Sequence, residues 1–174
     1  MKNYHSTGMY TLGFIIKDQK VLMLRRIKDP NSKKLNGLGG KIEHDESISE
    51  GMIREVKEEA GITPLNYKLS CLLKCFDTDS EKSYMIFCYL ISSFRGQANQ
   101  SNSEGELSWI DLKSIHVNNL DLVDNIPYFL PKILQDDSLL EMNFTYYPSK
   151  NLCDYRGFQD SKSWQGTFCL GNYF

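Results

Sequence analysis

The chain has 174 residues, of which 41% are hydrophobic and 24% charged, as in an ordinary globular protein, and this length predicts one domain spanning residues 1–174. Its net charge of −2 lacks the basic excess of proteins that bind duplex nucleic acid, so this class of partner is not expected. No apolar run approaches the roughly 20 residues of a membrane span and no basic-then-apolar leader is visible, so we expect a cytoplasmic protein without membrane contact.

Two strands joined by a tight turn are predicted at the N-terminal end. Residues 9–16 are rich in β-branched and aromatic residues, and residues 21–24 form a second apolar run after a polar turn. A polar loop over residues 27–36 then leads into residues 37–40, three of which are glycines. Glycines let a backbone approach a ligand or a metal ion closely, so this loop is a candidate binding element.

A helix is predicted over residues 48–60. Ser47 followed by Glu50 forms a capping box, and Gly61 is a typical C-terminal stop. Apolar residues recur at helical spacing, so one face is expected to pack on a core: Ile48, Met52, Ile53, Val56 and Ala60.

Three carboxylates share a second face of this helix, because Glu55, Glu58 and Glu59 stand at positions i, i+3 and i+4. Like charges this close destabilise a helix unless a cation lies among them. Hard oxygen ligands of this kind suit Mg²⁺ or Mn²⁺, ions that also bind substrate phosphates. The cluster therefore indicates metal-assisted phosphate chemistry, while an ordinary solvated face is the alternative for three glutamates taken alone.

The spacing around this helix resembles the box of the Nudix hydrolases, Gly-x5-Glu-x7-Arg-Glu-apolar-x-Glu-Glu-x-Gly-apolar. The resemblance implies a loop-helix-loop that holds divalent metal against a nucleoside diphosphate linkage, with Arg54 orienting a neighbouring glutamate through a salt bridge. It also implies an α/β fold in which a mixed, curved β-sheet is sandwiched between this helix and a second one. Residues 40–62 match every fixed position of the pattern: Gly40, Glu46, Arg54, Glu55, Val56, Glu58, Glu59, Gly61 and Ile62.

Residues 35–41 further resemble the glycine-rich stretch of MutT-like members of the family that act on oxidised purine nucleotides. In those members an asparagine contacts the purine base and a glycine carbonyl ligates metal, which implies these roles for Asn36 and Gly39. Lys41 closes the same stretch and is assigned with it to substrate binding. A basic residue at the end of the second strand lies near the nucleotide in these members, which implies this role for Arg26.

The middle of the chain predicts two further strands, residues 68–76 and 83–94, joined by a polar turn and preceded by a connector at residues 64–67. Residues 95–103 have loop composition. All five cysteines are expected to be reduced thiols, because their number is odd and they form no Cys-x-x-Cys pair.

The segment after this loop resembles the Glu-x-x-x-x-Trp strand that often brings a further carboxylate to the Nudix metal. Glu104, five residues before Trp109, corresponds to that carboxylate, and Glu106 is the alternate. An ordinary exposed loop acid is the competing interpretation.

A second helix is predicted over residues 121–135, interrupted by Pro127 and Pro131. MutT-like relatives hold the base with two adjacent carboxylates just before this helix. The tandem carboxylates are not reproduced here, and the resemblance leaves Asp124 as an acceptor and Asn125 as an amide for substrate binding.

Two strands around a turn are predicted over residues 139–155, and MutT-like proteins also end in such a hairpin. The tail from about residue 158 has no counterpart in the resemblance, and both a monomer and a homodimer are left open. Four aromatic residues favour packing of the tail on the body of the protein or on another subunit: Trp164, Phe168, Tyr173 and Phe174.

The activity implied by the resemblance is Mg²⁺-dependent hydrolysis of a nucleoside triphosphate to the monophosphate and pyrophosphate, with Mn²⁺ as a second possible ion. The resemblance favours oxidised purine nucleotides such as 8-oxo-dGTP as substrates. Such an activity implies a role in nucleotide-pool sanitation and DNA repair. The alternatives are another nucleoside triphosphate, a dinucleoside polyphosphate, ADP-ribose, or a non-catalytic module that senses a nucleotide. One of Glu58, Glu59 and Glu104 would be the general base, and Arg54 completes the catalytic set. The implied metal ligands are the Gly39 carbonyl, Glu55, Glu58, Glu59 and Glu104.

Overall fold

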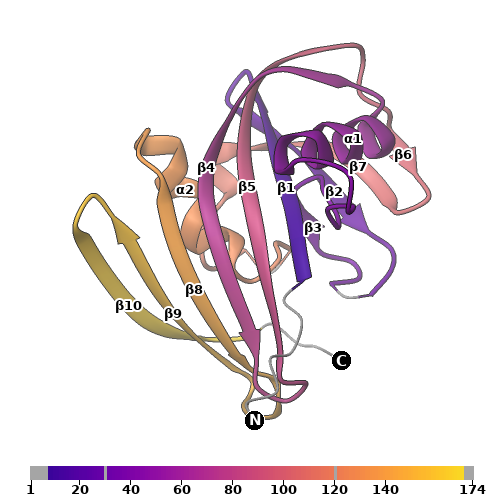
Figure 1. Cartoon of the computed structure of the whole chain (residues 1–174). Helices are drawn as coiled ribbons and strands as arrows, with labels where there is room; N and C mark the ends of the chain where they lie inside the picture. The colour runs from indigo at the N-terminus through magenta and orange to yellow at the C-terminus, as the bar shows by residue number, and fades with distance from the viewer. Residues whose placement is uncertain (1–7, 30, 120, 171–174) are drawn as a thin grey trace.

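The computed structural model describes residues 8–29, 31–119 and 121–170, which form one mixed sheet with two α-helices (Figure 1). In chain order the elements are β1 (Gly8–Lys17), β2 (Lys20–Arg26), β3 (Leu35–Asn36), α1 (Ile48–Ala60), β4 (Thr63–Asp77), β5 (Lys82–Arg95), β6 (Ser101–Asn102), β7 (Gly105–Asp111), the 3-10 turn η1 (Leu112–Ser114), α2 (Ile126–Gln135), β8 (Leu140–Tyr147), the 3-10 turn η2 (Pro148–Lys150), β9 (Leu152–Gln159) and β10 (Lys162–Cys169).

The strands lie in the order β10-β9-β8-β4-β5-β1-β2-β7-β6, with the short β3 paired to β2. The pairs β1–β5 and β4–β8 are parallel and the other pairs are antiparallel, so the predicted mixed sheet is confirmed. Long strands β4 and β5 twist and bend through the centre of the molecule (Figure 1).

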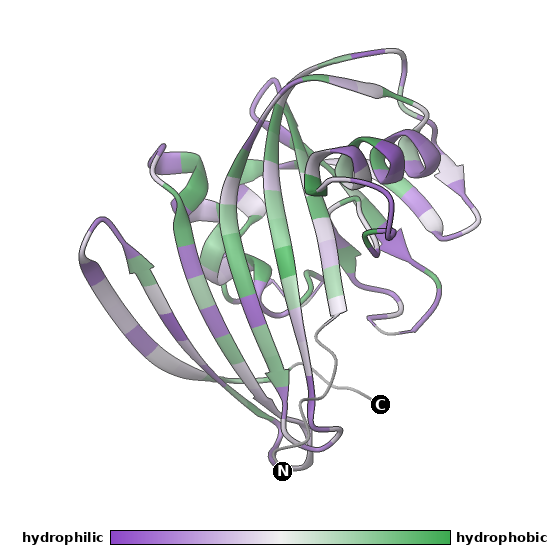
Figure 2. Ribbon diagram, in the orientation of Figure 1, coloured by the Kyte–Doolittle hydropathy of each residue, from purple (hydrophilic) through white to green (hydrophobic). Residues whose placement is uncertain are grey.

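Helix α1 covers one face of the sheet. Its predicted ends are confirmed, because Ser47 and Glu50 form the capping box and Gly61 adopts the left-handed conformation at φ 71°. The apolar face of the helix is fully buried at Met52, Val56 and Ala60, whereas its solvent side is hydrophilic (Figure 2). The core under α1 consists of Ile15, Leu22, Leu24, Leu38, Met52, Val56, Ala60, Ile62, Tyr89 and Ile91.

Helix α2 packs on a separate apolar cluster on the other side of the sheet, so the predicted sandwich is confirmed. The helix begins at Ile126 rather than at residue 121 as predicted, because residues 121–125 form a turn that pairs with the strand β3 region instead. Pro127 therefore lies in the first turn, where its missing N–H costs nothing, and only Pro131 lies inside the helix.

Strand β4 is longer than predicted, since it includes the residues 64–67 that were expected to form a connector. These residues pair with the far end of β5, with register shifts around Asn66. Tyr67 packs on the cluster under α1, and its ring lies 6.0 Å from that of Tyr89. A long strand partner thus imposes extended structure on a segment whose composition resembles a loop.

The C-terminal hairpin β8–β9 is confirmed, and the tail beyond it forms a further strand, β10, along the outer edge of β9. Of the two packing alternatives for the tail, the structure places it on the body of the chain. Trp164 and Phe168 pack against the α2 cluster, with Phe168 stacked on Tyr128 at 4.3 Å. Tyr173 and Phe174 lie outside the described residues.

All five cysteines are free thiols, and four of them are buried: Cys71, Cys75, Cys88 and Cys153. The prediction of reduced thiols therefore agrees with the structure. Among the described residues no helix is long and apolar enough to cross a membrane.

Candidate active site

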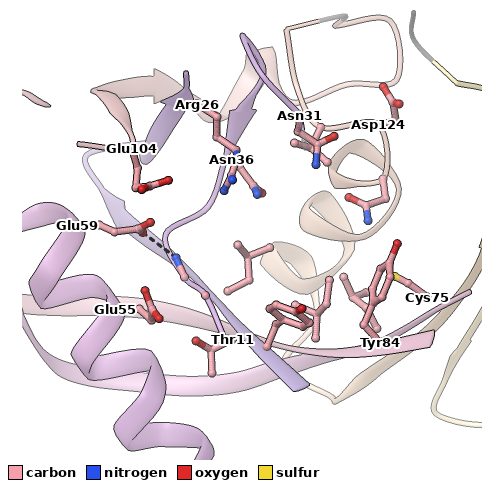
Figure 3. A pocket seen from close by; sticks show the side chains of 18 of the residues that line it. Thr11, Arg26, Asn31, Asn36, Glu55, Glu59, Cys75, Tyr84, Glu104 and Asp124 are labelled. Atoms are coloured by element: carbon pink, nitrogen blue, oxygen red, sulfur yellow. Dashed lines mark hydrogen bonds between the residues drawn. The ribbon is translucent and has the colours of Figure 1, made fainter. Parts of the chain in front are cut away.

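A cavity of about 740 Å³ lies between the C-terminal half of α1 and the start of α2. Figure 3 shows carboxylates beside α1 on one side, Cys75, Tyr84 and Asp124 on the other, and Arg26 and Asn36 between them. Neither Arg54 nor Lys41 lines the cavity. The structure brings the remaining predicted site residues into its wall: Arg26, Asn36, Gly39, Glu55, Glu58, Glu59, Glu104, Asp124 and Asn125.

Two glycines allow the backbone to pass close to the carboxylate end of the cavity. A Cβ atom on Gly39 would lie 2.1 Å from the Thr11 carbonyl oxygen, and one on Gly40 would lie 2.5 Å from the Glu55 Oε1. Any side chain at Gly39 would therefore collide with the backbone of β1. Glycine at these positions places the loop and α1 in direct contact.

Glu59 is the most deeply placed acid of the cavity, with 8% of its surface exposed. Burial raises its pKa to about 8, and the nearby Glu55 and Glu104 charges act in the same direction. A hydrogen bond from the Gly39 N–H to Glu59 Oε2 (2.8 Å) and the positive charge of Arg26 oppose this shift. The anion of Glu59 is thus incompletely compensated by the protein alone, which favours binding of a cation there.

Arg54 fixes the carboxylates from behind the cavity. Its guanidinium contacts Glu46 at 2.6 Å, Glu55 at 2.8 Å and Glu58 at 3.4 Å, so the predicted salt bridge to neighbouring glutamates is present. It also donates to the Lys41 carbonyl at 3.0 Å, which ties the glycine loop to the helix. Burial raises the pKa of Glu55, while the hydrogen bond and charge of Arg54 lower it.

Glu104 approaches from the segment before β7. Its carboxylate pairs with Lys28 at 2.8 Å, and that hydrogen bond lowers its pKa. Asn102 places this segment, because its Oδ1 accepts from the Glu104 and Gly105 N–H groups while its Nδ2 donates to the Glu59 carbonyl at 2.8 Å. The end of α1 and the Glu104 loop are thereby held together by one side chain.

The donor set at this end consists of hard oxygens, which fit a divalent cation such as Mg²⁺. Within the ranges that the structure describes, no three acidic, histidine or cysteine side chains form a ready-made metal cluster. Mg²⁺ in proteins usually keeps several waters and contacts one or two carboxylates together with substrate phosphates, so a closed protein cage is not required.

The opposite end of the cavity presents amide and carboxylate groups. Between the two ends, Asn36 Oδ1 accepts from the Gly37 N–H at 2.9 Å, which leaves its amide nitrogen for a ligand. Asp124 forms a partly buried ion pair with Lys34 at 2.5 Å. Asn125 is 7% exposed and donates from Nδ2 to the Tyr146 hydroxyl at 2.9 Å.

Sequence reasoning missed several wall residues, among them Thr11, Cys75, Tyr84 and Tyr146. They lie on β1, β4, β5 and β8, and the parallel pairings β1–β5 and β4–β8 together with the antiparallel pairing β4–β5 bring them to one place. Alternating apolar patterns mark these strands but carry no signal of which strands become neighbours. No motif in the sequence distinguishes these residues from core positions.

Comparison with known proteins places the chain in a family. The NUDIX domain model matches residues 9–133. An uncharacterized Nudix hydrolase, YvcI of Bacillus subtilis, is 32% identical over 80% of this chain and 87% of its own length. The ADP-ribose pyrophosphatase of Methanocaldococcus jannaschii is 26% identical over 59% of this chain and 61% of its own length. The crystal structure of a MutT protein from Bacillus halodurans covers 89% of this chain and 99% of its own, with 28% identity and a TM-score of 0.76.

The matched region contains the helix, the glycine loop and all of the carboxylates that meet at the cavity. The agreement with the MutT structure covers 89% of this chain and so extends well beyond the box itself. The chain belongs to the Nudix family, and it is a hydrolase that acts on nucleoside diphosphate-linked substrates.

Proposed function

We propose that this Nudix hydrolase cleaves nucleoside triphosphates to the monophosphate and pyrophosphate with Mg²⁺, and that oxidised purine nucleotides such as 8-oxo-dGTP are its preferred substrates. The proposal includes a role in nucleotide-pool sanitation. It rests on the continuity of the cavity, whose carboxylate end and amide end lie in one space of about 740 Å³. A space of this size accepts a base at one end while its phosphates reach the other.

Each end has a distinct part in this proposal. Asn36, Asp124 and Asn125 bind the base, whereas Arg26 lies beside the acids and attracts phosphate oxygens. Arg54 forms an ion pair with Glu55. This ion pair holds Glu55 in position among the acids that face the substrate.

The metal would be held by Glu55, Glu58, Glu59, Glu104 and the Gly39 carbonyl. When bound, such an ion neutralises phosphate charge and makes water a better nucleophile. Glu58, Glu59 and Glu104 are the candidate general bases. Only Glu58 is largely exposed, with 61% of its side chain open to solvent, whereas Glu59 is buried and Glu104 is paired with Lys28.

Product analysis across a substrate panel tests the proposal. Pyrophosphate and phosphate release with Mg²⁺ should be measured for dGTP, 8-oxo-dGTP, the other common dNTPs, ADP-ribose and diadenosine polyphosphates. We expect the highest kcat/KM for 8-oxo-dGTP with pyrophosphate as product, and no turnover when EDTA removes the metal. Indifference to the base would contradict the proposed base recognition while leaving the family chemistry intact.

The variant Glu58→Gln tests the proposed role of the carboxylate end of the cavity. Loss of one carboxylate that binds metal or takes a proton should lower kcat at least about a hundredfold without loss of fold. Glu141→Gln is the control, because Glu141 is an exposed acid on β8 outside the cavity. Full activity of Glu58→Gln would show that the metal-binding and proton-accepting roles are wrongly assigned to the carboxylate end of the cavity.

Hydrolysis of ADP-ribose is the second candidate function, because the matched relative from Methanocaldococcus jannaschii is an ADP-ribose pyrophosphatase. The same carboxylate end serves either substrate, since both contain a diphosphate linkage. A kcat/KM highest for ADP-ribose, with AMP as product, would favour this candidate over the first.

A further inference from the structure

Strand β10 forms one edge of the sheet, and no strand lies beyond it among the residues that the structure describes (Figure 1). It pairs with β9 over all eight of its residues without a bulge. The opposite edge is formed by β6, which has two residues. Natural sheets protect their exposed edges with very short strands, prolines, bulges or charged residues. Strand β6 is protected by its shortness, whereas β10 is long and contains no proline and one charged residue, Lys162.

The turn before β10 decides which of its backbone groups point outward. Asp160 and Ser161 have φ angles of 46° and 65°, which are typical of a two-residue type I′ turn that bonds the Lys162 N–H to the Gln159 carbonyl. Because the direction of hydrogen bonding alternates along an antiparallel strand, every second residue from Lys162 onward faces β9. The N–H and C=O groups of the residues between them face away from β9: Ser163, Gln165, Thr167 and Cys169. In the part of the chain that the structure describes, no strand or loop backbone pairs with these outward groups.

The side chains of β10 are arranged almost symmetrically about Gly166. The four outward-facing residues have exposed, uncharged side chains on one face of the strand. On the other face, Trp164 and Phe168 lie two residues before and two residues after Gly166, and both are half-buried against the α2 cluster. A second β10 strand that runs antiparallel and is centred on Gly166 therefore places each Trp164 opposite the partner's Phe168.

We propose that two copies of the chain pair through β10, antiparallel and with Gly166 on the twofold axis, so that the two sheets become one continuous sheet. In this register Ser163 lies opposite the partner's Cys169, and Gln165 lies opposite the partner's Thr167. All outward backbone groups are then used, in about eight hydrogen bonds. An axis at Gln165 or Thr167 instead leaves one of these residues unpaired in each copy and about six hydrogen bonds, so the Gly166 register is favoured.

The aromatic side chains support the same register. Trp164 and the partner's Phe168 occupy positions without mutual backbone hydrogen bonds, where side chains across an antiparallel pair come closest together. Aromatic pairs at such positions stabilise a sheet beyond the area that they bury. Gly166 meets its own copy on the axis between these two pairs and adds no side chain there.

Charge repulsion does not oppose this pairing. The two copies of Lys162 lie about 27 Å apart along the paired strands, at 3.4 Å per residue, which exceeds the Debye length of about 8 Å at physiological ionic strength. A symmetric pair also uses the long free edge of both copies, so the assembly closes as a dimer and does not grow into a fibre. None of the four outward-facing residues lines the cavity, so each active site stays open in the dimer.

Light scattering coupled to gel filtration over a concentration series tests the dimer. We expect the wild type to have twice the chain mass of 20.1 kDa. Gln165→Pro removes one outward N–H from each copy and no hydrogen bond to β9, because this N–H faces away from β9. It should weaken dimerisation at least about thirtyfold, as the loss of two neutral backbone hydrogen bonds implies. Gln165→Ala is the matched control, since it keeps the N–H and should remain dimeric.

A cross-link tests the register and also covers the case in which Gln165→Pro does not fold. In the proposed dimer residue 163 faces the partner's Cys169, whereas the two copies of Cys169 lie about 20 Å apart. Cys169 is exposed and the other four cysteines are buried. A short bismaleimide should therefore join two chains of Ser163→Cys and leave the wild type as single chains on a denaturing gel. Ser101→Cys is the matched control, because Ser101 is an exposed serine on β6 at the opposite edge of the sheet.

The proposal is overturned by a wild type that stays monomeric at every concentration, and this edge would then be left to a strand of a different protein. It is also overturned if folded Gln165→Pro dimerises as tightly as the wild type, or if Ser163→Cys is cross-linked no more than Ser101→Cys. These measurements contain no nucleotide, so they are independent of the proposed substrate.

Discussion

At the scale of single residues, Glu46 shows how the box depends on one arginine. Two hydrogen bonds from Arg54, at 2.6 and 2.9 Å, lower the pKa of Glu46 to about 2, and the Glu43 N–H contributes a third at 2.8 Å. Glu46 does not line the cavity. Its charge keeps Arg54 in place, and Arg54 in turn holds the acids that do line it.

A pH series on Glu46→Gln measures this coupling. Because the folded pKa lies below the ordinary value of 4.5, the stabilisation is complete above about pH 4.5 and is lost as the pH falls towards 2. We expect Glu46→Gln to melt several degrees below the wild type at pH 7, and the gap to narrow below about pH 4.5. Glu43→Gln, an exposed acid in the same loop, should melt like the wild type. A difference in melting temperature between Glu46→Gln and the wild type that does not change with pH would contradict a stabilising ion pair between Glu46 and Arg54.

At the scale of elements, β10 turns the aromatic tail into part of the core. Gly157 on β9 lies opposite Trp164 on β10, and a Cβ at Gly157 would approach the Trp164 ring to 2.4 Å and the Met142 sulfur to 2.6 Å. The indole is also covered by the ammonium of Lys132 at 4.2 Å from the ring centroid. The contact between β9, β10 and α2 therefore depends on the absence of a side chain at one position.

Gly157→Ala is expected to displace the Trp164 ring and to destabilise the fold by about 1–3 kcal/mol, the usual cost of overpacking. Urea unfolding followed by tryptophan fluorescence measures both effects. Ser163→Ala, at an exposed position of β10, should change stability by less than about 0.5 kcal/mol. An alanine at residue 157 that leaves stability unchanged would show that β10 packs more loosely than described.

At the scale of the whole molecule, the cysteines report on the integrity of the sheet. Cys71 and Cys88 are paired across β4 and β5, and Cys75 and Cys153 lie in the same apolar cluster. Burial raises the pKa of Cys75 to about 12 and also raises that of Cys88 and Cys153. Neutral, enclosed thiols react slowly with alkylating and disulfide reagents.

Thiol titration of the native protein should therefore detect one fast-reacting group, the exposed Cys169, and five after unfolding. Cys169→Ser should abolish the fast phase and leave four thiols in the unfolded chain. Reductant should not change the melting temperature, since the structure has no disulfide to break. A second fast thiol in the native protein would mean that the sheet opens locally.

The parts of this protein whose interactions are local could be predicted from the order of its amino acids. The α1 helix, its capping box and its C-terminal glycine depend on contacts three or four residues apart, so their spacing is visible in the chain. The same spacing placed Glu55, Glu58 and Glu59 on one helix face and pointed to the family. The hairpins β1–β2 and β8–β9 were predicted for the same reason.

Features that depend on pairing between distant segments could not be predicted in this way and became visible in the folded chain. Strand β10 and the first residues of β4 are extended because a neighbouring strand satisfies their backbone groups, although their own composition resembles a loop or a tail. The far wall of the cavity follows from the parallel pairing of β4 with β8, which brings Cys75 and Tyr146 into the same wall. Hydrophobic alternation records which face of a strand is buried but not which strand lies beside it, so this wall became visible only in the fold.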